Sequence, residues 1–122
     1  MTHRRIIFSS LAPNPVGPYS QAVLAPAGQG PTLYLSGQIG LNPVTRQMVS
    51  DTDVAAQATQ AFTNMKAVVE AAGGTLANVL KVNIFITDMA NFSAVNEVMK
   101  HFFEAPYPAR STVAVAALPL GA

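Results

Sequence analysis

The strongest hydrophobic pattern in the chain runs from Val54 to Ala72. Apolar residues recur there at the spacing of one helix face, at Val54, Ala58, Ala61, Phe62, Met65, Val69 and Ala72. The preceding residues 51–53 (Asp-Thr-Asp) supply oxygen acceptors and negative charge, both of which stabilise a helix N-terminus. Residues 73–74 are both glycine, a typical helix end. The pattern predicts a helix of about 20 residues, roughly 30 Å long.

A second and shorter helix is predicted after Asn91, which is a suitable N-cap residue. His101 falls beside its apolar stripe and is expected to be exposed rather than to act as a ligand. The stripe itself has the spacing of a core-facing helix surface and consists of Phe92, Val95, Met99 and Phe102.

Extended segments are predicted around these helices, at residues 5–8, 23–25, 32–38, 79–86 and 110–117. Residues 26–31 are rich in Pro and Gly, which predicts the turn of a β-hairpin. In the third segment Leu33 and Leu35 share one face, while Tyr34 and Ser36 share the other. In the fourth segment one face is filled by Leu80, Val82, Ile84 and Ile86.

The order of strands, helix, strand, helix and strand predicts an α+β fold, one domain over residues 1–122, with two helices packed on one face of a mixed sheet. Residues 113–116 of the final strand alternate Val and Ala, so both of its faces are apolar. The sheet face that the helices leave uncovered therefore needs a partner. Another copy of the same chain is the simplest one.

Composition narrows the classes of function. Half of the 122 residues are hydrophobic and 11% are charged, which excludes a disordered chain and favours self-association. The formal net charge is +1 without a basic patch, so we expect no nucleic-acid partner. No stretch is apolar for the length of a membrane span. The chain has no cysteine, so it has no disulfide and no thiolate ligand or nucleophile, which fits a cytoplasmic location.

Residues 106–113, Pro-Tyr-Pro-Ala-Arg-Ser-Thr-Val, place one guanidinium at the start of an otherwise uncharged strand. The two prolines stiffen the approach to Arg110. An arginine is costly to bury unless it meets an anion, and its planar fork suits a carboxylate. From spacing alone, two other arrangements remain open: a pair with a structural Asp or Glu, and a side chain simply in solvent.

Four stretches together resemble the signature of the RidA/YjgF family of reactive-intermediate deaminases, and they span nearly the whole chain. They are residues 17–22 (GPYSQA), 36–40 (SGQIG), 95–98 (VNEV) and 108–111 (PARS). The resemblance implies a chorismate-mutase-like fold, assembled as a homotrimer whose sheets line a central barrel, with sites between neighbouring subunits.

The resemblance also implies an activity: hydrolysis, without cofactor or metal, of small 2-imino acids and enamines such as 2-aminoacrylate and 2-iminopropionate to 2-keto acids and ammonia. Arg110 would hold the substrate carboxylate and act with Tyr19 in catalysis. The residues that would line the pocket are Ser36, Gly37, Asn96 and Thr112. Many relatives carry Cys at the last position, so a thiol plays no part here.

One departure concerns the general base. The family's chain continues past the position of Ala122 into a last strand with a Glu thought to activate the water, and we expect that strand to be absent from residues 1–122. The role of that Glu as general base would then fall to Tyr19, to a neighbouring subunit or to bulk water.

Each of these residues also has a purely structural interpretation. Tyr19 could pack its ring at the sheet edge, Ser36 and Gly37 could only form a turn, and Asn96 could bond to a loop. At the level of the whole protein, the alternative is a non-catalytic trimer that binds 2-keto acids or similar carboxylates at Arg110. An RNA-directed activity fits less well, because the basic patch it needs is missing.

Overall fold

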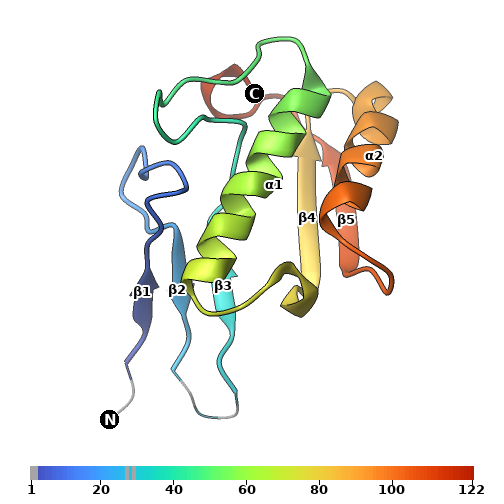
Figure 1. Cartoon of the computed structure of the whole chain (residues 1–122). Helices are drawn as coiled ribbons and strands as arrows, with labels where there is room; N and C mark the ends of the chain where they lie inside the picture. Colours follow the sequence, from blue (N-terminus) through green and yellow to red (C-terminus); the bar gives the residue numbers. More distant parts are fainter. Residues whose placement is uncertain (1–2, 27, 29) are drawn as a thin grey trace.

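The computed structural model describes residues 3–26, 28 and 30–122 (Figure 1). The elements follow the order expected from the hydrophobic pattern. The strands are β1 (Arg5–Ile7), β2 (Ala22–Leu24), β3 (Leu33–Leu35), β4 (Lys81–Ile86) and β5 (Ala109–Ala114), and the helices are α1 (Val54–Ala71) and α2 (Phe92–Phe102).

The first sheet is antiparallel, in the order β1-β2-β3. The predicted hairpin between β2 and β3 is confirmed, and Ala25 N–H donates to the Thr32 carbonyl at 2.8 Å. The predicted turn at 26–31 includes positions 27 and 29, which lie outside the described residues. Leu33 and Leu35 pack against the core while Tyr34 is 67% exposed, so this strand has the predicted two faces.

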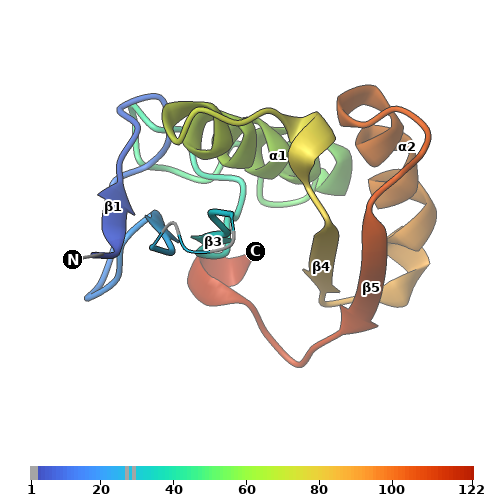
Figure 2. The same ribbon diagram turned by 90° about the horizontal axis from the view of Figure 1, so that it is seen from below.

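The second sheet consists of β4 and β5 in parallel, with Val82 opposite Arg110 and Ile84 opposite Thr112. The predicted mixed sheet is thus present as two sheets, because in the described ranges no backbone ladder joins β3 to β4. Figure 2 shows the two sheets apart, with the C-terminal segment turning between them.

The first helix begins and ends as the sequence predicts. The Asp53 side chain accepts a hydrogen bond from Ala56 N–H at 3.1 Å. Gly73, with φ of +90°, follows the last turn in a conformation that favours glycine. The second helix begins at Phe92, as predicted, but Asn91 makes no capping bond with its side chain. Asn91 instead closes a 3-10 turn that Asp88 caps by accepting from Ala90 N–H at 2.9 Å.

Both helices pack on one side of the strands, and Figure 2 shows this layer. The main core is formed by Phe62, Val69, Leu76, Val82, Val98, Met99 and Phe103. A smaller cluster beside β1 and β2 contains Ile7, Ala12, Ala22 and Val68. On the uncovered side of the strands, apolar side chains are exposed to solvent, including Phe85 at 51% and Val113 at 46%. The single chain therefore leaves an apolar surface that a partner could cover.

Several predicted strand limits are wrong. Strand β4 starts at Lys81 rather than Val79, because a 3-10 turn at Leu76–Asn78 precedes it. Leu80 therefore lies before the strand and is 82% exposed instead of filling the core face. The final strand ends at Ala114 rather than at residue 117: β4 ends at Ile86, whose carbonyl accepts from Val115 N–H, so later residues have no strand to pair with.

Strands β1 and β3 are shorter than predicted, since β1 ends at Ile7 and β3 covers only Leu33–Leu35. Strand β2 has the predicted length but lies one residue earlier, at Ala22–Leu24. His101 is exposed, as expected. None of the helices in the described part of the chain is long and apolar enough to cross a membrane.

Candidate active site on helix α2 and strand β5

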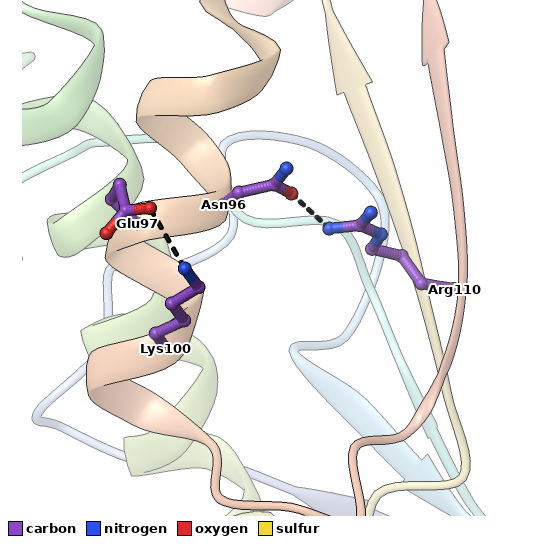
Figure 3. Close-up of polar contacts among 4 residues, drawn as sticks. All are labelled: Asn96, Glu97, Lys100 and Arg110. Atoms are coloured by element: carbon purple, nitrogen blue, oxygen red, sulfur yellow. Dashed lines mark hydrogen bonds and ion pairs between the residues drawn. The ribbon is translucent and has the colours of Figure 1, made fainter.

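Arg110 lies at the second position of β5, and its side chain reaches across to α2 (Figure 3). Its Nη1 donates a hydrogen bond to Asn96 Oδ1 and lies 3.9 Å from Met99 Sδ. Its Cζ lies 5.1 Å from the centroid of the Phe92 ring, a cation–π arrangement. The guanidinium is therefore neither simply in solvent nor paired with an acid; it is held by α2.

An open pocket of about 490 Å³ adjoins this group. Its lining includes the charged side chains Glu97, Lys100 and Arg110. Lys100 Nζ and Glu97 Oε1 are 3.0 Å apart and neutralise each other, and this is the only ion pair in the described ranges. Arg110 therefore gives the pocket a net positive charge, which suits a small anion.

Asn96 sits in the middle of α2, a position where asparagine is unfavourable in general. Its bond to Arg110 explains its presence there, because the amide oxygen accepts from a charged donor. The alternative, a bond from the Asn96 side chain to a loop, is formed with none of the loop residues that the structure describes.

Thr112 follows Arg110 two residues along β5, so both side chains lie on the same face of the strand. Its Oγ1 is buried and has no hydrogen-bond partner among the described residues. Such an unpaired hydroxyl is costly, and a ligand or a water molecule that bonded to it would remove that cost.

Tyr19, Ser36 and Gly37 form a second group, at the adjoining ends of β2 and β3. The Ser36 hydroxyl donates to the Ser20 carbonyl at 2.5 Å, and Ser36 N–H donates to the Gln21 carbonyl at 3.0 Å. Tyr19 Oη accepts from Val16 N–H at 3.2 Å, and the side chain is 47% exposed. Ser36 thus fastens the segment that carries Tyr19, while a Cβ added at Gly37 would meet no described atom within 4 Å.

The two groups are on opposite sides of β4. Figures 1 and 2 both place β1–β3 on one side of β4, and β5 with α2 on the other. Hydrogen bonds connect Arg110 with Asn96 and Ser36 with the backbone next to Tyr19, and in the described ranges none connects one group to the other. In the single chain the candidate residues therefore form two separate groups.

Three further residues belong to these groups and were not singled out in the sequence. Phe92 and Met99 were assigned only to the core-facing stripe of α2, although Phe92, Asn96 and Met99 share the spacing of one helix face. Gln21 is 2% exposed, and its role is clear only from its bonds to residues 9–13. The helical spacing of Phe92 and Met99 around Asn96 was the one feature of the sequence that could have indicated their place beside Arg110.

No metal centre is evident in the residues that the structure describes, since no three His, Asp or Glu side chains lie close enough together to hold an ion. The acceptors that contact Arg110 are an amide oxygen and a thioether sulfur, and the carboxylate in the pocket lining, Glu97, is paired with Lys100. These groups suit an organic anion better than a hard cation.

The α+β fold is that of the RidA/YjgF class of proteins. The family described as Endoribonuclease L-PSP matches residues 9–122, and the chain belongs to that family.

The relatives agree with this assignment over nearly their whole length. The chain is 57% identical over 122 residues to a 2-iminobutanoate/2-iminopropanoate deaminase of Dermatophagoides farinae, covering 100% of this chain and 91% of the relative. It is 45% identical over 118 residues to the protein of that name in Homo sapiens, covering 97% and 82%. The crystal structure of RidA from an Antarctic Psychrobacter species superimposes with a TM-score of 0.86 at 45% identity, covering 96% and 90%.

Proposed function

We propose that this protein is a cofactor-independent deaminase that hydrolyses small 2-imino acids and their enamine tautomers to 2-keto acids and ammonia. The names of relatives 45–57% identical to the chain support the assignment. The observation that carries it is Arg110: an exposed guanidinium, without an acidic partner in the described chain, that lines a pocket of suitable size. The substrates are 2-aminoacrylate, 2-iminopropionate and similar acids.

The chemistry requires little more than orientation. A 2-imino acid has a carboxylate as a fixed anionic handle and an electrophilic carbon next to it. Water adds to that carbon, the carbon–nitrogen bond of the resulting carbinolamine breaks, and ammonia leaves as the keto group forms. A bidentate Arg110 fixes the handle, and Asn96 lines the pocket beside it. Thr112, two residues further along β5 on the same strand face, offers its unpaired hydroxyl to the substrate. Most of the rate gain therefore comes from positioning.

Tyr19 is the second catalytic residue in this proposal. Its oxygen accepts from Val16 N–H, so its hydroxyl hydrogen remains available for donation to substrate or water. Ser36 and Gly37 complete this half of the pocket, Ser36 by fixing the backbone next to Tyr19 and Gly37 by leaving room for the ligand.

The two groups meet between copies of the chain. The protein assembles as a homotrimer of the chorismate-mutase-like type, in which the Arg110 group of one copy faces the Tyr19 group of a neighbour. An apolar surface on the uncovered side of the strands supports this assembly. We call it the strand face, and it consists of Ile6, Val23, Tyr34, Phe85 and Val113.

The reaction takes place in the cytoplasm, where the absence of cysteine pairs is usual. The ligand is a small molecule rather than a nucleic acid, because the formal net charge is only +1.

The direct test follows keto-acid formation from freshly generated 2-iminopropionate. Wild-type protein should accelerate it, and Arg110→Ala should remove the acceleration. Arg46→Ala is the matched control, because Arg46 is an exposed arginine in a loop away from the pocket, and it should retain activity. Equal traces for wild type and Arg110→Ala would contradict the proposal. Saturable pyruvate binding in calorimetry without any turnover would instead support a carboxylate-binding module.

A further inference from the structure

Three side chains of α2 approach the guanidinium of Arg110 from the same helix face. Phe92, Asn96 and Met99 are spaced four and three residues apart, which aligns them along one side of the helix. Asn96 Oδ1 and Met99 Sδ both contact Nη1, and the Phe92 ring centroid lies 5.1 Å from Cζ. Met99 is 5% exposed and belongs to the core, so this part of the contact is fixed by packing.

The number of donors on an arginine shows which N–H groups of Arg110 the contacts with α2 leave free. A guanidinium has five N–H groups, two on each Nη and one on Nε. Nη1 has two hydrogens and contacts two acceptors on α2, whereas Nε and Nη2 form no hydrogen bond with any described residue. The free edge is the side edge made by Nε–H and Nη2–H. A ligand that used both Nη groups would have to displace Asn96.

We infer that Arg110 binds its carboxylate through the side edge, Nε–H and Nη2–H, and that Phe92 and Met99 are positioning residues that set the direction of that edge. The identity of the ligand rests on the proposed function, but the geometry of the edge does not. Phe92 attracts the cation through the face of its ring and shields one side of it from water. Met99 limits how far Nη1 can turn toward the core.

The binding mode can be tested on the wild-type protein by nuclear magnetic resonance of the arginine Nε–H groups. The chain has four arginines, and Arg110→Lys identifies the signal of Arg110 by its loss. Titration with pyruvate should shift the Arg110 Nε–H signal downfield and saturate at the dissociation constant found by calorimetry, while the other three signals stay in place. Pyruvate binding with an unmoved Nε–H signal would overturn the inference and leave the proposed function intact.

The positioning role is tested by Phe92→Leu. Loss of the cation–π contact should weaken pyruvate binding and raise KM by roughly 2- to 30-fold, with kcat changed less, because the contact is present in ground and transition states alike. Phe92→Tyr should restore both values. Met99→Leu, which keeps the core volume but removes the sulfur acceptor, should raise KM in the same direction.

Phe102→Leu is the matched control, since Phe102 is on the same helix but stacks on Phe62, with ring centroids 5.4 Å apart. It should lower the stability of the fold while KM remains within about twofold. Equal rises in KM for Phe92→Leu and Phe102→Leu would mean that α2 acts only through its stability, and would overturn the positioning role. A protein with neither turnover nor pyruvate binding would contradict the proposed function as well, so the two failures are distinguishable.

Discussion

Gln21 and Ser9 exchange two hydrogen bonds in the interior of the protein. Gln21 Oε1 accepts from Ser9 N–H at 2.6 Å, and Gln21 Nε2 donates to the Ser9 carbonyl at 3.0 Å. The same Nε2 lies 2.9 Å from the Pro13 carbonyl. Gln21, two residues after Tyr19, therefore satisfies backbone groups in the proline-containing segment 9–13, which pairs with none of the described strands.

Gln21→Leu should destabilise the protein by about 1–3 kcal/mol, because the Ser9 N–H and the Pro13 carbonyl lose their bonds to the buried Gln21 side chain. The urea midpoint of unfolding measures this loss. Gln47→Leu is the control: Gln47 is exposed, and its change should stay within about 0.5 kcal/mol. Equal midpoints for the two variants would show that the buried hydrogen bonds of Gln21 add no more to the free energy of unfolding than the exposed Gln47 side chain does.

Asn96→Asp tests how the neighbour of Arg110 controls the pocket. The change keeps the shape of the side chain but places a carboxylate against the guanidinium, where it competes with the substrate carboxylate. We expect kcat/KM for 2-iminopropionate to fall by at least about tenfold, the equivalent of one strong charged contact. Glu97→Gln changes a charge one residue away, on a side chain paired with Lys100, and should have a smaller effect. The reverse order of the two effects would contradict this account.

Gly40 and Gly37 should respond differently to alanine. A side-chain carbon at Gly40 would lie 2.8 Å from Gln57 Cα on α1, so Gly40→Ala forces the loop away from the helix. We expect a loss of about 1–3 kcal/mol in thermal or urea unfolding. A side-chain carbon at Gly37 would meet no described atom within 4 Å, so Gly37→Ala should leave the stability unchanged. Because Gly37 borders the substrate in the proposed site, the same variant should raise KM. Normal stability of Gly40→Ala would refute the close packing.

Phe85→Asp and Val113→Asp test the strand face. The two residues are opposite each other on β4 and β5 and are 51% and 46% exposed in the single chain. A charge at either position would be buried on assembly without a partner, so each variant should shift the trimer toward monomer in sedimentation velocity and lower activity with it. Asp substitution at Val44, which is 87% exposed in a loop, is the control and should leave the oligomer intact. A wild-type protein that sediments as a monomer at micromolar concentration would contradict the intersubunit site.

Arg46→Gly should stabilise the protein. Arg46 has φ of +62°, a conformation that glycine adopts without the steric cost paid by other residues. The expected gain is roughly 0.5–1 kcal/mol after the greater flexibility of glycine in the unfolded chain is counted. Arg46→Ala retains the unfavourable φ and should show no such gain in stability. An equal gain in both variants would mean that removal of the arginine charge, and not relief of backbone strain, stabilises the protein.

Much of the fold was predictable from local patterns. The periodicity of Val54 to Ala72, with Asp53 before it and Gly73 after it, fixed the limits of α1 closely, because helix hydrogen bonds and caps are formed between neighbours in sequence. The strand limits were less accurate. Each depends on where a partner strand from another part of the chain ends, as Ile86 shows for the end of β5.

The sequence by itself determined the two helices and the order of the strands along the chain. Through its resemblance to a known family it also led to the prediction that Arg110, Asn96 and Tyr19 serve the site. Only the tertiary structure decided that Phe92 and Met99 face the guanidinium, that Gln21 is buried, and that the Arg110 and Tyr19 groups lie on opposite sides of β4. The physical reason is that hydrophobic periodicity records which face of an element avoids water. It carries no information on which polar or aromatic side chain of a distant element will meet that face once the chain has folded.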